Sequence, residues 1–379
     1  IIIDMYTVDN FINGTANTVS NESSLIIDPS YGKDIGKVLY ATIDSADLAI
    51  ESAKQAFENW SQTGLSYRAE LILKFRQGVI DRSNEIIDIC TTEAGKTRPD
   101  AEAELDRAIQ ALTNASAVQH FYPSHLSPNV AGGIDIVDRR YPIGVIAGVG
   151  PFNFPILIPI LHSAMALVTG NTYIAKPSEK VPSISRLYAD IYKESGLPDG
   201  CYNVVNGSKE IVEHLVCHKD IAGLAFIGST VAARSLKMLG VEHNTKVQAL
   251  GGGKNHMIVL PDADLDMSAD AAVSASFGAA GQRCMAVSVV IAVGDIADDL
   301  INKVKVNGKT ALKTKMTPGW ILETGQWFDR YFNILPLFFL IPFSVLLAQT
   351  GKFDIIGLIF WNINIIGLIS VSYTHLTLP

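Results

Sequence analysis

A repeated alternation of short apolar runs and helical segments, beginning at Tyr141, constrains the fold more than any other feature. Four runs typical of buried strands are each followed by a segment with helical spacing: YPIGVIAGVG, NTYIAKPS, YNVVNG and IAGLAFIG. The helices are predicted to end at Val168, Glu194, Cys217 and Leu239. Repeated strand–helix units predict a parallel sheet with helices on its faces. Ligands of such sheets bind beyond the carboxyl ends of the strands.

Helical segments precede this region and a second α/β unit follows it. Residues 44–60 have apolar side chains at helical spacing, with Ser45 as the predicted N-cap. Further helices are predicted over 67–90 and 99–120. After the strand-like runs KVQAL and HMIVL, a helix over SADAAVSASFGAAGQRC is predicted to lead into the strand VSVVIAVG. The chain is therefore predicted to be an α/β protein with two domains of this kind.

Composition argues against several classes of function. The 379 residues carry 30 basic and 38 acidic side chains, a formal net charge of −8, which offers no electrostatic footprint for nucleic acid. The cysteines are far apart, which predicts a reducing, cytoplasmic location without structural disulfides. They are Cys90, Cys201, Cys217 and Cys284. The eight histidines form no recognisable ligand set, so no metal site is predicted.

Two apolar stretches near the end of the chain, 331–348 and 355–373, contain no charged residue and reach the length of a membrane helix. One interpretation is a membrane anchor, which would make the protein membrane-associated. Prolines interrupt the first stretch and asparagines the second, and both are costly in lipid. The other interpretation is that this tail is foreign to the preceding domain, as in a truncated or frame-shifted reading.

Two segments at predicted strand ends have the chemistry of nucleotide binding. Gly228 and Ser229 follow a strand and open a helix, where free N–H groups favour a pyrophosphate, although a simple helix cap fits equally well. Lys176 and Glu179 follow another strand and offer an ammonium and a carboxylate for ribose hydroxyls. The alternative for this second segment is a solvated turn.

Two further residues are candidates for catalysis. Cys284 follows Arg283, whose charge favours a thiolate, the form of cysteine that attacks a carbonyl. The alternative is a small buried apolar residue. Asn153 lies between Pro151 and Pro155 and is placed to donate to an oxyanion, or serves only as a turn residue.

Taken together, these motifs resemble those of the aldehyde dehydrogenase superfamily over about residues 11–305. The matching segments are FNFP at 152–155, KPSE at 176–179, FIGST at 226–230, the glycines at 251–253 and GQRC at 281–284. The resemblance implies a Rossmann-like NAD-binding domain and a truncated α/β catalytic domain. It also implies a homo-oligomer. The implied boundaries are 1–122 with 141–253 for the NAD-binding domain, 123–140 for part of an oligomerisation domain, 254–305 for the start of the catalytic domain, and 306–379 for a non-family apolar tail.

The resemblance also implies the role of each candidate residue. Cys284 would be the nucleophile, and Asn153 would donate to the oxyanion beside the backbone N–H of Cys284. Lys176 and Glu179 would hold the adenosine ribose of NAD. Gly228 and Ser229 would hold the pyrophosphate.

Within the superfamily, GAAGQRCMA at 278–286 and KNHMIVLPDAD at 254–264 resemble the coenzyme A-acylating branch, which includes methylmalonate-semialdehyde dehydrogenase. Leu250 stands where hydrolytic members carry a glutamate, and leucine cannot activate water. The branch implies transfer of the acyl group to coenzyme A, giving propionyl-CoA or acetyl-CoA with loss of CO₂. Arg283 and Arg107 match arginines that bind the substrate carboxylate.

The later E-x-F-G-P motif and the C-terminal oligomerisation strand of the family are not found, so the catalytic domain is expected to be incomplete. Three alternatives therefore remain open: a simple aldehyde-to-acid dehydrogenase, a non-catalytic membrane-anchored protein, and an inactive truncated homologue.

Overall fold

The computed structural model describes residues 5–121, 124–314 and 355–359. The chain divides into two compact units. The first comprises Ile1–Ala94 and Ala101–Gly251, and the second comprises Gly95–Asp100 and Gly252–Pro379.

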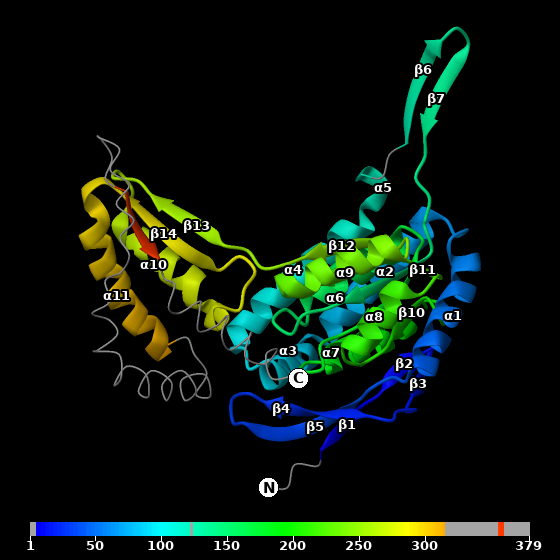
Figure 1. The fold of residues 1–379 in the computed structure, drawn as a ribbon, viewed down its shortest axis with the longest axis horizontal. Helices are drawn as coiled ribbons and strands as arrows, with labels where there is room; N and C mark the ends of the chain where they lie inside the picture. Colours follow the sequence, from blue (N-terminus) through cyan, green and yellow to red (C-terminus); the bar gives the residue numbers. More distant parts are fainter. Residues whose placement is uncertain (1–4, 122–123, 315–354, 360–379) are drawn as a thin grey trace. The chain divides into compact units, whose positions relative to one another are not determined.

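The first unit is built on a seven-stranded sheet with the order β12-β11-β8-β9-β10-β2-β3. Strands β12, β11, β10, β2 and β3 of this sheet are labelled in Figure 1. Five neighbouring strands are parallel: β8 (Val145–Val149), β9 (Thr172–Lys176), β10 (Tyr202–Val204), β11 (Ile221–Ile227) and β12 (Lys246–Leu250). Antiparallel β2 (Asn10–Ile12) and β3 (Thr15–Asn17) extend one edge. The chain runs from β8 outward to β10, then returns to place β11 on the other side of β8. This Rossmann-like order creates a switch point between β8 and β11, where such sheets bind ligands.

Alternate residues of the central strands face two separate hydrophobic cores, as the two-residue repeat of a strand requires. Ala147, Ile174 and Leu224 belong to the core formed with α1 (Ile43–Trp60), α8 (Lys209–Cys217) and α9 (Thr230–Glu242). Tyr173 and Ala175 belong to the other core. The helices of this other core are α2 (Leu65–Asp81), α3 (Ser83–Glu93), α4 (Arg98–Ser116), α6 (Leu157–Val168) and α7 (Ser183–Glu194). The predicted parallel sheet with helices on both faces is confirmed.

Smaller elements complete the first unit. A three-stranded sheet contains β1 (Tyr6–Val8), β5 (Lys33–Leu39) and β4 (Ser23–Asp28), in that order. The short helix α5 (Val118–Phe121) precedes a two-stranded hairpin of β6 (His125–Ala131) and β7 (Ile134–Asp138). Every residue of the two hairpin strands is exposed. The hairpin falls within 123–140, the segment expected to belong to an oligomerisation domain.

The second unit has a three-stranded sheet in the order β13-β14-β15. β13 (Asn255–Val259) and β14 (Val287–Val293) are parallel, and β15 (Ile355–Ile359) is antiparallel to β14. Its core contains Val259, Ala272, Val290 and Leu300, from the sheet and from α10 (Leu265–Phe277) and α11 (Ala297–Thr314). Short 3-10 turns, η1 (Gly278–Gly281) and η2 (Gly294–Ile296), flank β14.

The expected boundary at residue 305 falls inside α11. Residues 355–359, which belong to the second apolar stretch, form strand β15, so the membrane-helix interpretation is wrong for them. The rest of both apolar stretches lies outside the described residues. Within the described ranges, no helix has the length and apolar character needed to cross a membrane.

The structure corrects three local predictions. The N-cap of α1 is Thr42 rather than Ser45, because the Thr42 side chain accepts the Ser45 N–H and the helix begins at Ile43. The helix predicted over 67–90 is two helices, separated at Arg82, whose backbone leaves the helical region (φ −102°, ψ 20°). The helix predicted over 99–120 likewise ends at Ser116, before α5.

Candidate active site

The carboxyl ends of the parallel strands bring most of the predicted nucleotide-binding residues of the first unit to one edge. Val149 of β8 pairs in register with Lys176 of β9 and with Phe226 of β11. Ile227 pairs with Leu250 of β12. The segments that leave these strands therefore all begin at the same edge of the sheet, which includes the switch point.

Asn153 lies in the loop that leaves β8, and its side chain is partly buried. Gly150, at the start of this loop, donates its N–H to the carbonyl oxygen of Lys176 at 3.1 Å. Phe154 accepts the N–H of Ile158, in the first turn of α6, at 3.2 Å. The backbone is thus fixed on both sides of Asn153.

Lys176 is the last residue of β9 and is almost fully buried, so the solvated-turn alternative is wrong for this side chain. Its Nζ lies 3.6 Å from Oε2 of Glu179, which is partly exposed. Burial lowers the pKa of the Lys176 ammonium, since it disfavours the charged form, while Glu179 opposes this change. A desolvated ammonium at a strand end is a strong donor for hydroxyl oxygens of a ligand.

Ser229 is the N-cap of α9, and its Oγ accepts the N–H of Ala232 at 3.3 Å. The capping alternative is therefore confirmed for this side chain. Capping by Ser229 and a nearby anion are compatible, because a helix has more than one unpaired N–H in its first turn. Gly228 has no space for a side chain, since a Cβ would lie 2.5 Å from the ring of Phe226.

Leu250 ends β12, where its carbonyl oxygen accepts the N–H of Gly228 at 3.1 Å. Its side chain is 50% exposed. This position therefore has an anchored backbone and an accessible side chain that contains no proton acceptor.

Cys284 lies in the second unit, exposed in the turn between η1 and β14. The preceding helix was predicted to reach this cysteine, and this prediction is wrong, because α10 ends at Phe277. Ala279 and Ala280 follow with φ of 50° and 54°, in the left-handed region. The helix has already ended at its C-cap, Gly278, whose backbone is extended (φ −56°, ψ 135°), and the left-handed alanines after it cannot continue α10.

Asn255, at the start of β13, is a site residue that the sequence interpretation missed. Its Nδ2 donates to the carbonyl oxygens of Cys284 at 3.0 Å and Ala286 at 2.9 Å. The side chain thus fixes the backbone that carries the thiol. An asparagine directly after the GGGK segment was the available signal, because an amide can satisfy two carbonyls at once.

The two predicted carboxylate-binding arginines lie on different units. Arg283 donates from Nη2 to Oδ1 of Asp100 at 2.7 Å, within the second unit. Its guanidinium occupies the space that a side chain at Gly278 would need, since a Cβ there would lie 2.6 Å from Cζ of Arg283. Asp100 is thus the acidic partner of this guanidinium. Arg107 is exposed on α4 of the first unit.

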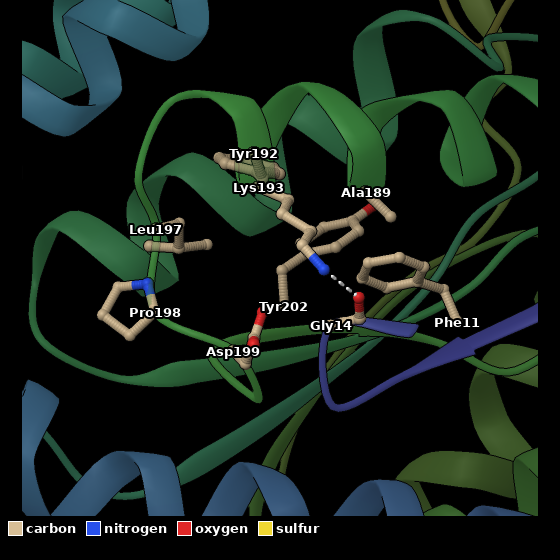
Figure 2. Close-up of a pocket in the computed structure, with 9 residues that line it drawn as sticks. All are labelled: Phe11, Gly14, Ala189, Tyr192, Lys193, Leu197, Pro198, Asp199 and Tyr202. Carbon is tan, nitrogen blue, oxygen red and sulfur yellow. Dashed lines mark hydrogen bonds between the residues drawn. The ribbon is translucent and has the colours of Figure 1, made fainter. Parts of the chain in front are cut away.

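A small depression of the first unit lies among residues other than these candidates (Figure 2). Lys193 donates from Nζ to the carbonyl oxygen of Gly14 at 2.5 Å, which ties the β2–β3 turn to α7. The lining residues are Phe11, Gly14, Ala189, Tyr192, Lys193, Leu197, Pro198, Asp199 and Tyr202. None of the predicted site residues is among them, so we interpret this depression as a packing feature.

Comparisons with known proteins agree with this architecture. A model described as the aldehyde dehydrogenase family matches residues 17–318. Malonate-semialdehyde dehydrogenase 2 of Geobacillus thermodenitrificans (strain NG80-2) is 38% identical over 300 residues, which are 79% of this chain and 62% of that protein.

Two crystal structures are similar to about four fifths of this chain. Methylmalonate-semialdehyde dehydrogenase from Oceanimonas doudoroffii has a TM-score of 0.78 and 37% identity, covering 82% of this chain and 63% of that one. A Sinorhizobium meliloti 1021 protein described as the same enzyme, complexed with NAD, also has a TM-score of 0.78, with 38% identity and the same coverage.

The fold and the strand-end residues define an α/β protein with a Rossmann-like sheet and a second α/β unit that carries an exposed cysteine. This chain belongs to the aldehyde dehydrogenase family. It spans less than two thirds of the length of the curated relatives that it matches.

Proposed function

We propose that this chain carries the active-site residues of an NAD-dependent, coenzyme A-acylating dehydrogenase of malonate or methylmalonate semialdehyde. The observation that carries the proposal is the exposed Cys284, whose backbone is fixed by Asn255 in a chain of this family. In this proposal the residues at the strand ends bind the cofactor. Leu250 favours acyl transfer over hydrolysis.

In the first step, the sulfur of Cys284 bonds to the aldehyde carbon, and the electron pair of the C=O bond moves to the oxygen. Asn153 stabilises this oxyanion together with the backbone N–H of Cys284. Fixed donors of this kind act mainly on the transition state, because they are oriented before the charge develops.

The first unit fits a dinucleotide at the carboxyl edge of its sheet. A buried ammonium at Lys176 and the N-terminus of α9 offer donors to hydroxyl and phosphate oxygens. In this proposal Lys176 and Glu179 hold the adenosine ribose, and Gly228 with Ser229 hold the pyrophosphate. When bound, NAD supplies the acceptor for the hydride that leaves the substrate carbon.

The product on Cys284 is a thioester, and its fate depends on the next nucleophile. Leu250 provides neither a proton acceptor nor a hydrogen bond to orient water, so hydrolysis is slow. The thiol of coenzyme A, with an ordinary pKa of about 8.5, supplies some thiolate at neutral pH. Its sulfur displaces Cys284 from the acyl carbon and regenerates the free cysteine.

Arg283 binds the substrate carboxylate in this proposal, with Arg107 as a second candidate. A guanidinium has five N–H donors, so the Asp100 contact at Nη2 is compatible with a second carboxylate on the same group. The carboxylate later leaves as CO₂, its bonding electron pair passes to the α carbon, and that carbon takes a proton.

The test is NADH formation from malonate semialdehyde, followed by absorbance with and without coenzyme A, together with mass spectrometry of the acyl product. We expect steady NADH and acetyl-CoA formation that require coenzyme A, and no NADH from Cys284→Ala, which still binds NAD. Free acid formed at full rate without coenzyme A would support the simple aldehyde-to-acid dehydrogenase instead.

We also infer that the β6–β7 hairpin contacts another copy of this chain. An isolated two-stranded hairpin is marginally stable in water, and this one exposes Leu126, Ile134 and Ile136. Ile134→Asp with Ile136→Asp should lower the mass in analytical ultracentrifugation to that of a monomer. An unchanged mass would remove the hairpin from the assembly.

The apolar segment 331–373 is, in our proposal, foreign to the dehydrogenase family, although its residues 355–359 form β15 and pair with β14. The family match ends at residue 318, before this segment begins. Replacing 331–354 with a Gly-Ser linker of equal length, which keeps β15 available to pair with β14, should raise the soluble yield, because exposed apolar segments promote association. A protease-protected fragment of 331–348 in bilayers would support a membrane anchor from the first apolar stretch.

A further inference from the structure

We propose that Glu104 is a positioning residue for Asn153, acting through the N-terminus of α6. The inference rests on the proposed function, in which Asn153 stabilises the oxyanion. Glu104 is on α4 and is 3% exposed, which is rare for a carboxylate.

The N-terminal turn of α6 has no capping side chain of its own. Its sequence from Pro155 onward is PILIP, and the N-cap residue, Ile156, makes no side-chain hydrogen bond to the helix. Unpaired N–H groups of a buried helix end require acceptors from elsewhere, because no water is available to them.

Glu104 provides this acceptor. Its Oε1 accepts the N–H of Ile156 at 2.8 Å and the N–H of Leu157 at 2.9 Å. The next N–H, that of Ile158, donates to the carbonyl oxygen of Phe154, and residue 159 is a proline without an N–H. Every donor from Ile156 to Pro159 is therefore accounted for, two of them by Glu104.

The charges at the two ends of α6 match its dipole. The carboxylate of Glu104 lies at the N-terminus of α6. At the C-terminus of α6, Arg68 donates from Nε to the carbonyl oxygen of Val168 at 2.9 Å. Trp60 donates from Nε1 to the adjacent carbonyl of Leu167 at 3.1 Å. An apolar helix thus receives its caps from neighbouring helices, in the favourable order of negative at the start and positive at the end.

This clamp acts directly on the segment that carries Asn153. Asn153 is three residues before Ile156, whose carbonyl oxygen also accepts the hydroxyl of Tyr188 at 3.0 Å. On the other side, Gly150 is held by Lys176. The sections before and after Asn153 are fixed, and loss of Glu104 removes two of the hydrogen bonds that fix the second one. A displacement of about 1 Å at a catalytic group can reduce the rate by about 10²-fold.

The test compares Glu104→Gln and Glu104→Ala with Asp106→Asn, an exposed carboxylate on the same helix. Each variant is made in the full chain and checked for folding by circular dichroism. We expect faster amide exchange at Ile156 and Leu157 in both Glu104 variants, with the smaller change in Glu104→Gln because its amide oxygen can still accept. Asp106→Asn should match the wild type.

The second readout is the side-chain amide signal of Asn153 in ¹⁵N NMR spectra, identified as the signal that Asn153→Asp removes. It should shift or broaden in Glu104→Ala. An unchanged Asn153 signal in a folded Glu104→Ala would overturn the inference, whether or not the chain turns over substrate.

A double-mutant cycle separates positioning from general stability. In single turnovers, Glu104→Ala should lower the rate of NADH formation by about 10²-fold, with little change in the aldehyde KM. In an Asn153→Ala background the same substitution should have almost no further effect. Equal losses in both backgrounds would overturn the inference. If the wild type forms no NADH while the Asn153 signal still depends on Glu104, the proposed function fails and the positioning role stands.

Discussion

Asn255 and Cys284 are joined by a hydrogen bond of 3.0 Å from the side-chain Nδ2 to the backbone carbonyl oxygen. The same Nδ2 reaches the carbonyl of Ala286, so one side chain fixes both sides of Met285 in the cysteine turn. The rigidity of this turn therefore comes from a neighbouring strand, because the turn itself is exposed.

Asn255→Ala should loosen the turn that carries the nucleophile. Loss of two hydrogen bonds lowers the free energy of unfolding by about 1–3 kcal/mol, and kcat falls while NAD affinity is retained. Urea unfolding and steady-state kinetics measure the two effects. His256→Ala, next along the strand, is the control, and equal kinetic losses in both variants would contradict a specific role for Asn255.

Arg283→Ala should raise the KM for malonate semialdehyde by about 10- to 100-fold, since a charged hydrogen bond contributes about 1.5–3 kcal/mol. The KM for propanal, which has no carboxylate, should not change. Comparing the two aldehydes in one variant removes effects on the cysteine turn. Arg107→Ala tests the second arginine in the same way, and Arg76→Ala on α2 is the control.

Leu250→Glu should raise the rate of NADH formation without coenzyme A, because the new carboxylate can take a proton from water. The matched control is Leu250→Gln, which has a similar shape and cannot act as a base. The exposed side chain and the anchored backbone at this position favour folding of both variants. Equal rates in the two variants would show that residue 250 does not determine hydrolysis.

Lys176→Met should weaken NAD binding by about 10- to 100-fold, because methionine fills the buried space and removes the charged donor. Isothermal titration calorimetry measures the Kd directly. Lys209→Met, at an exposed lysine of α8, should leave the Kd unchanged. An unaffected Kd in Lys176→Met would return Lys176 to a purely structural role.

His162, on α6, should make the protein less stable in mild acid. Burial lowers the pKa of its imidazole to about 4, and Nδ1 is buried without a hydrogen-bond partner among the described residues. In the unfolded state the pKa of this histidine is about 6.5, so the unfolded state binds more protons between pH 6.5 and 4. The free energy of unfolding is therefore highest above pH 6.5 and decreases as the pH falls to 4. The shift corresponds to about 3 kcal/mol at most.

The measurement is urea unfolding of the wild type and His162→Leu at several pH values from 4 to 7.5. The difference in unfolding free energy between the two proteins should change by up to about 3 kcal/mol over this range. His125→Gln, on the exposed β6 strand, is the control. A difference that does not vary with pH would show that His162 is not buried in solution.

Much of the fold was predictable because its buried parallel strands are mostly apolar, as in β8, and are separated by helices of regular spacing. Local boundaries were less predictable. Thr42 and Ser45 are both good N-cap residues, and only the start of α1 at Ile43 decides between them. The helix break at Arg82 and the left-handed backbone of Ala279 were not predictable, because neither an arginine nor an alanine requires the backbone conformation that it adopts there.

By itself, the sequence determined the α/β class, the family, and the residue types of the site, because each of these depends on local periodicity or on short motifs. Only the tertiary structure decided that β11 returns to lie beside β8, which creates the switch point at the carboxyl edge. It also decided that Glu104 caps α6 and that Asn255 holds the cysteine turn. These contacts join residues 52 and 29 positions apart, and neither partner carries a local pattern that specifies the other.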